Sequence, residues 1–99
     1  MTPEHKDTCR AAVHHYGADA QTDQAIEECL ELALILQRLK RKDRPVAPPH
    51  IITEIADVAI MVEQLAIIYG PTAVADQVDL KMRRLAQRIA LVHCTHTPA

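Results

Sequence analysis

The sequence contains few aromatic residues and few glycines. Its 99 residues include two tyrosines, Tyr16 and Tyr69, but no tryptophan and no phenylalanine, so its apolar core must be built from aliphatic side chains. Only two residues are glycine, and long stretches rich in Ala, Leu, Glu, Gln and Arg favour helices over strands. These absences disfavour a β-sheet protein and indicate an all-α fold.

A strong charge of either sign is also missing. The formal net charge is −2 and the pI is about 6.3, which provides no general field for a nucleic-acid polymer or an anionic membrane. No apolar run approaches the length of a membrane span, and the N-terminus lacks the apolar segment of a signal peptide. The three cysteines form no C-x-x-C pair, which favours a reducing compartment. We therefore expect a cytoplasmic protein.

Proline and glycine divide the chain into four predicted helices. Their approximate ranges are residues 3–16, 20–42, 50–69 and 72–92. Gly17 and the Gly70-Pro71 pair separate consecutive helices, and three prolines place a loop over residues 41–49. Short connections between four helices are typical of a bundle. We expect a single domain over residues 1–99, with its core at about 20–92 and a flexible tail at 95–99.

The second and third predicted helices are apolar on nearly every side. Their aliphatic residues include Ile26, Leu30, Leu34, Leu36 and Leu39, then Ile51, Ile55, Ile60, Val62 and Ile68. Helices of this kind are buried on most sides, and a chain this short has little surface with which to cover two of them. The pattern predicts a homo-oligomer in which a second subunit covers part of both helices.

Acidic residues interrupt the apolar stripes of these two helices. The second helix carries Glu27, Glu28 and Glu31, and the third carries Glu54 and Asp57. Each of the pairs 28/31 and 54/57 is spaced i, i+3, so its members lie on one side of a helix. Both pairs share their stripe with aliphatic residues, which predicts that they point inward. Buried carboxylates are costly unless a cation neutralises them, and their hard oxygens suit Mg²⁺ or Mn²⁺.

Two other interpretations of the acidic residues stay open. A single E-x-x-E on a helix usually forms a solvated face, and a non-enzymatic helical dimerisation or adaptor module would tolerate neutral residues at these positions. A di-iron or di-manganese carboxylate bundle normally needs Glu-x-x-His pairs on two helices, and none is present. The nearest substitute is His50, four residues before Glu54.

Several motifs occur together over about residues 20–90. They are Gln21, the run E-E-C-L-E-L from Glu27 to Leu32, the run E-I-A-D-V-A-I-M-V-E-Q-L from Glu54 to Leu65, and the cations Lys81 and Arg84. In this combination the chain resembles the MazG-like all-α nucleotide pyrophosphohydrolases, in particular the short single-domain forms of phages and bacteria. If the chain is phage-encoded, the expected location is the host cytoplasm.

The resemblance implies a helical fold that assembles as dimers or tetramers. It also implies Mg²⁺-dependent hydrolysis of a (d)NTP to the (d)NMP and pyrophosphate, as nucleotide-pool housecleaning or remodelling. By position, Glu28, Glu31, Glu54 and Asp57 would hold Mg²⁺. Glu27 matches the first acid of the motif, and would activate water or support the ligands. The catalytic candidates are therefore Glu27, Glu28 and Glu31.

Polar residues outside the acidic motif supply candidate substrate contacts. Lys81, Arg84 and Arg88 form one row on the fourth predicted helix, suited to a triphosphate, although such a row is usually solvated or paired with acids. The resemblance favours Lys81 and Arg84. Gln21 lies on the acidic stripe about two turns before Glu28, where it would contact a sugar or base or, alternatively, cap the helix.

Overall fold

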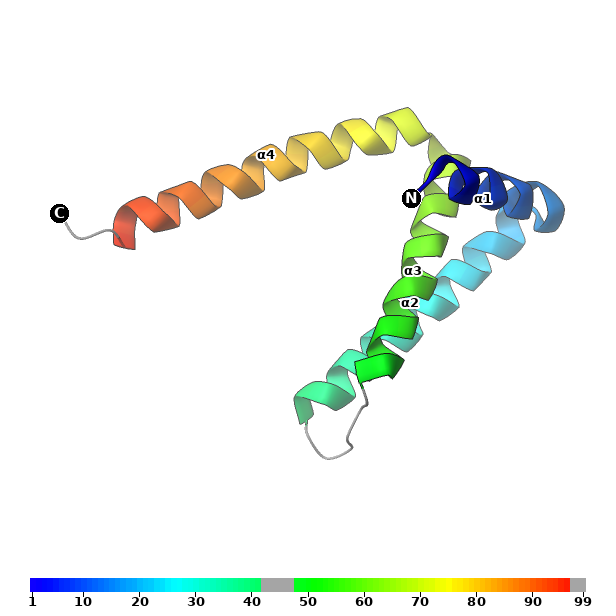
Figure 1. Cartoon of the computed structure of the whole chain (residues 1–99), viewed down its shortest axis with the longest axis horizontal. Coiled ribbons are helices and arrows are strands. Elements are labelled where there is room, and N and C mark those ends of the chain that lie inside the picture. Colours follow the sequence, from blue (N-terminus) through cyan, green and yellow to red (C-terminus); the bar gives the residue numbers. More distant parts are fainter. Residues whose placement is uncertain (42–47, 97–99) are drawn as a thin grey trace. The chain divides into compact units, whose positions relative to one another are not determined.

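The computed structural model describes residues 1–41 and 48–96, and these form four α-helices and no strand. The helices are α1 (Pro3–Tyr16), α2 (Ala18–Arg41), α3 (Pro48–Tyr69) and α4 (Pro71–His96) (Figure 1). The all-α expectation is confirmed. The loop expected at 41–49 lies mostly outside the described residues, as do residues 97–99 of the expected tail.

Local sequence signals set the helix ends. Thr2 caps α1, because its hydroxyl accepts a hydrogen bond from the His5 backbone N–H at 3.1 Å, and Pro3 occupies the first turn. Gly17 ends α1 with a φ of 90°, and Gly70 separates α3 from α4 with a φ of 121°, a region that glycine enters without steric cost. Prolines also begin α3 and α4. The chain extends α4 through Thr95 and His96, beyond the end expected near residue 92.

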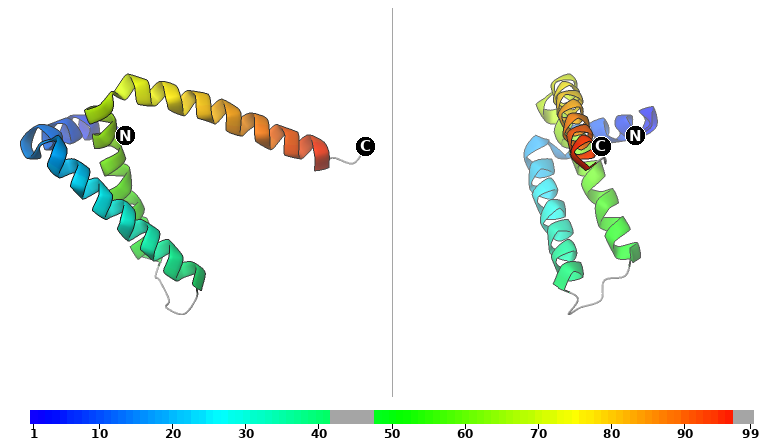
Figure 2. Two further views of the ribbon diagram at one scale, coloured as in Figure 1. Left: turned by 180° about the vertical axis from the view of Figure 1, so that it is seen from behind. Right: turned by 90° about the vertical axis from the view of Figure 1, so that its left-hand side faces the viewer.

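The chain separates into two compact units, residues 1–68 and 69–99. In the first unit, α2 and α3 run antiparallel to each other (Figure 2, right). Helix α1 packs against both, and the Cys9 Sγ atom lies 4.0 Å from the backbone carbonyl oxygen of Ile60 on α3. The second unit consists mainly of α4.

The core of the first unit is small. Its buried apolar side chains are Cys9, Ala25 and Met61, one from each of its helices. Many larger side chains on α2 and α3 stay exposed, among them Leu30 at 65% and Ile52 at 66%. Within the first unit, much of the aliphatic surface that the sequence carries on these two helices is therefore uncovered. None of the helices in the described part of the chain meets the length and hydropathy that a bilayer crossing requires.

Candidate functional site

A buried pair of amides aligns α2 with α3. The Gln21 side chain donates a hydrogen bond from Nε2 to Oε1 of Gln64 at 2.6 Å, and both side chains are buried. The Nε2 group of the Gln64 amide donates a hydrogen bond to the sulfur of Met61 at 3.8 Å. Because a buried amide without a partner is costly, this pair favours one axial alignment of the two helices over its neighbours.

That alignment brings acidic residues of the two helices together. Glu28 lies seven residues after Gln21 on α2, and Asp57 lies seven residues before Gln64 on α3, so in antiparallel helices the two acids meet at the same level. Glu54 lies on the same face of α3, one turn earlier. Each of these three half-buried residues offers a carboxylate oxygen, and these oxygens lie within 4.8 Å of one another. We call Glu28, Glu54 and Asp57 the acidic cluster.

Two oxygens of the acidic cluster have no partner. Oε1 of Glu28 accepts a hydrogen bond from the Gln24 amide at 2.9 Å, whereas Oε2 of Glu28 and Oε2 of Glu54 are buried without a hydrogen bond. Within the described ranges no lysine, arginine or histidine forms an ion pair with the cluster. Buried polar atoms normally have a hydrogen-bond partner. Two buried carboxylate oxygens without one are therefore suited to bind a cation. Carboxylate oxygens are the ligands that Mg²⁺ and Mn²⁺ prefer.

Glu31 and Glu27 lie beside the cluster but outside it. Both side chains are exposed, although Glu31 was expected among the inward-pointing ligands. The inward side of α2 follows Gln21, Ala25 and Glu28, and a further step of three residues turns Glu31 about 60° away from Glu28 towards solvent.

The acidic cluster changes the titration of Glu31. The negative charge of Glu28 raises the pKa of the Glu31 carboxyl, and desolvation and the charges of Glu54, Glu27 and Asp57 act in the same direction. A carboxyl whose folded-state pKa is raised favours folding at low pH, and this contribution is lost as the pH rises through the raised pKa. In the metal-free protein, the charged form of Glu31 therefore opposes folding at neutral pH.

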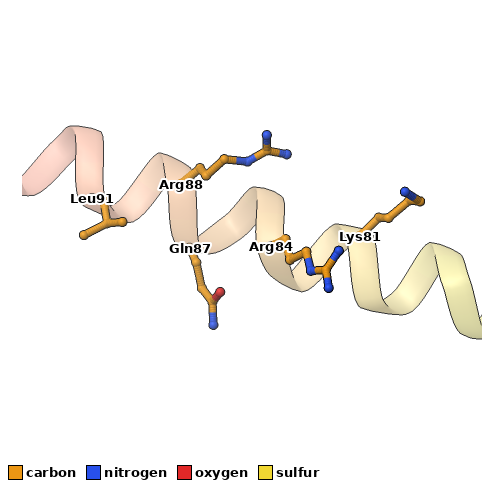
Figure 3. Close-up of a pocket in the computed structure, with 5 residues that line it drawn as sticks. All are labelled: Lys81, Arg84, Gln87, Arg88 and Leu91. Carbon is orange, nitrogen blue, oxygen red and sulfur yellow. The ribbon is translucent and has the colours of Figure 1, made fainter.

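The cationic candidates lie on α4, in the second unit. Lys81, Arg84 and Arg88 are exposed, and together with Gln87 and Leu91 they line a shallow hollow along the helix (Figure 3). Lys81 and Arg88 project from one side of α4, and Arg84 and Gln87 from another, so the side chains do not converge on one point (Figure 3). This arrangement offers a basic surface and not an enclosed pocket.

No protein-family model, curated protein or solved structure matches this chain. A candidate function must therefore be argued from the residues and from the geometry that they adopt.

Gln64 belongs to this region but was not among the candidates from sequence. Its position in the sequence could have identified it. Gln64 follows Asp57 by seven residues, or two turns, on the inward side of α3, and Gln21 precedes Glu28 by the same number on α2. The Gln21 amide, expected to contact a sugar or base or to cap the helix, is instead engaged with Gln64.

The amide pair leads to a prediction about stability. Replacing Gln21 by leucine leaves the Gln64 amide buried without its partner, and we expect the free energy of unfolding to fall by about 1–3 kcal/mol. The double variant Gln21→Leu, Gln64→Leu removes both polar groups and should recover most of this loss. Urea unfolding followed by circular dichroism measures both values. Equal losses for the single and double variants would contradict the role assigned to the pair.

Proposed function

We propose that this chain is a Mg²⁺-dependent nucleoside triphosphate pyrophosphohydrolase that resembles the MazG-like enzymes. The observation that carries the proposal is the acidic cluster, in which two helices place three carboxylates together and leave two buried oxygens unpartnered. A purely structural acidic face would leave such oxygens in solvent or pair them with cations.

In this proposal Glu28, Glu54 and Asp57 hold the cation, and Glu31 completes the set from the exposed side of α2. The bound ion would neutralise charge on the phosphate oxygens of the nucleotide. Glu31 also suits the role of a base that accepts a proton from the attacking water, because its side chain is exposed beside the acidic cluster. Glu27 would orient Glu31 or the water from the neighbouring position.

The remaining candidates take supporting roles. Exposed Lys81 and Arg84 are proposed to contact the triphosphate, since ammonium and guanidinium groups donate strong hydrogen bonds to phosphate oxygens. Because the Gln21 amide is occupied by Gln64, we assign Gln21 to positioning α2 against α3. The large exposed aliphatic side chains on both helices support assembly with further copies of the chain. Nucleotide-pool housecleaning or remodelling in the cytoplasm is the corresponding biological role.

The test is a substrate screen with product analysis. The purified chain is incubated with each canonical NTP and dNTP, with Mg²⁺ or with EDTA, and the products are separated by anion-exchange chromatography. We expect nucleoside monophosphate and pyrophosphate in equal amounts, and only with the metal. Release of inorganic phosphate and nucleoside diphosphate would contradict the proposed bond cleavage. No product from any nucleotide would favour the alternative, a helical dimerisation or adaptor module.

A further inference from the structure

The carboxylate of Glu28 is held by a residue of its own helix. Gln24 lies four residues before Glu28 on α2, and its Nε2 group donates a hydrogen bond to Oε1 of Glu28 at 2.9 Å. The second oxygen of the same carboxylate, Oε2, is buried and has no hydrogen-bond partner. The two oxygens of Glu28 therefore have different surroundings, because one is occupied by a donor and the other is available to a ligand.

The spacing of Gln24 and Glu28 explains why they meet. Residues four apart on a helix are neighbours on its surface, and helical side chains point back towards the N-terminus of the helix. The Glu28 side chain is therefore directed towards the turn that carries Gln24. Both residues belong to α2, so the contact depends neither on the residues that join α2 to α3 nor on the second unit.

A glutamate carboxylate without such a contact has little preferred orientation. The last torsion of the side chain is broad, and the freedom of the whole side chain is lost when it binds a ligand. The hydrogen bond from Gln24 fixes the Glu28 carboxylate before a cation arrives. Since Glu28 contributes one of the three carboxylate oxygens that lie within 4.8 Å of one another, this pre-orientation lowers the entropic cost of binding a cation at the acidic cluster.

The neutral charge of the Gln24 amide is also important. A lysine or arginine at this position would donate a similar hydrogen bond, but its positive charge would compete with a metal ion for Glu28. In the described part of the chain, no basic side chain forms an ion pair with the acidic cluster. An amide therefore orients the carboxylate and leaves the negative charge of the cluster to attract a cation.

We propose that Gln24 is a positioning residue for the cation site, and that it acts by holding the carboxylate of Glu28 in the orientation that binds the metal. Residues that hydrogen-bond to a metal ligand commonly increase the affinity of the site for its ion. The inference rests on the cation binding that the proposed function assigns to the acidic cluster, and it is independent of the hydrolytic step.

The experiment is a titration of the full chain with Mn²⁺ in the absence of nucleotide, in which electron paramagnetic resonance measures the free ion. Gln24→Met keeps the length and helix propensity of the side chain but removes the donor. We expect the Kd for Mn²⁺ to rise about tenfold. The melting temperature without metal should change little, because a side-chain pair of this spacing contributes only weakly to helix stability.

Two further variants separate positioning from other effects. Gln37→Met makes the same substitution at an exposed position of α2, half a turn around the helix from Glu28, and should keep the wild-type Kd. Gln24→Lys restores a donor but adds a positive charge, and should bind Mn²⁺ more weakly than the wild type. Circular dichroism establishes that each variant keeps its helical content.

The possible outcomes separate this inference from the proposed reaction. An unchanged Kd in Gln24→Met, with or without a lower melting temperature, would overturn the positioning role and leave the cation site in place. Equal weakening in Gln24→Met and Gln37→Met would overturn it as well. A wild-type chain that binds no Mn²⁺ would overturn both the inference and the cation site. The expected loss of affinity in a chain that hydrolyses no nucleotide would support the inference and contradict the reaction alone.

Discussion

Replacing Asp57 by asparagine is expected to lower Mg²⁺-dependent pyrophosphate release by a factor on the order of 100 or more, while the helical fold persists. Asp57 is one of three residues whose carboxylate oxygens lie within 4.8 Å of one another, and an amide at this position removes the negative charge without changing the side-chain size. The loss should appear in kcat more than in the KM for the nucleotide, because the phosphates retain their cationic contacts.

The same substitution should not destabilise the metal-free protein. Asp57 contributes to the repulsion that raises the pKa of Glu31, so removing its charge relieves part of that repulsion. The matched control is Asp23→Asn, which neutralises an exposed acid on α2 and should keep full activity. Equal activity of the Asp57→Asn variant and the wild type would remove the acidic cluster from the proposed reaction, even if pyrophosphate release itself were confirmed.

Addition of Mg²⁺ is expected to raise the melting temperature of the wild-type chain strongly. A ligand that binds only the folded state, at about 100 times its Kd, contributes about 2.7 kcal/mol. In a domain of this size that corresponds to an increase of roughly 10–20 °C in Tm. The physical source is the neutralisation of carboxylates whose buried oxygens otherwise have no partner. Differential scanning calorimetry over a titration of MgCl₂ measures the shift.

The control for this prediction is the double variant Glu28→Gln, Asp57→Asn. Without metal it should melt at or above the wild-type temperature, because two of the mutually repelling charges are gone, and Mg²⁺ should then shift its Tm very little. A titration with NaCl at matched ionic strength separates site binding from general screening. If both proteins respond alike to Mg²⁺, the cluster is not a cation site.

The elements of this fold could be predicted closely from sequence because the residues that end helices are unambiguous. Gly17, Gly70 and the prolines at the starts of α3 and α4 mark boundaries that differ from the expected ones by about two residues. The end of α4 was placed too early, because no glycine or proline stops the helix before His96. Periodicity also predicted that Glu28, Glu54 and Asp57 share the inward sides of their helices, and the structure brings them together.

The alignment of α2 with α3 was harder to predict. A helical wheel specifies the direction of a side chain but not its height relative to a neighbouring helix. The pairing of Gln21 with Gln64 therefore did not follow from the spacing within each helix. The residues that join the two helices, 42–47, are outside the described ranges, and their number by itself sets no register. The decisive contacts are long-range in sequence and depend on the packed pair.

The hydrogen bond between Gln21 and Gln64 has a consequence for how the cluster responds to its ligand. Sliding α2 past α3 by one helical turn, about 5.4 Å, would separate the amides and move Glu28 away from Asp57 in the same motion. The amide pair and a bound cation therefore stabilise one alignment of the helices in common. Two interactions that favour the same conformation strengthen each other, and this linkage is reciprocal. The hydrogen bond between Gln21 and Gln64, about 10 Å along the helices from the acidic cluster, is therefore expected to increase the affinity of the cluster for a cation.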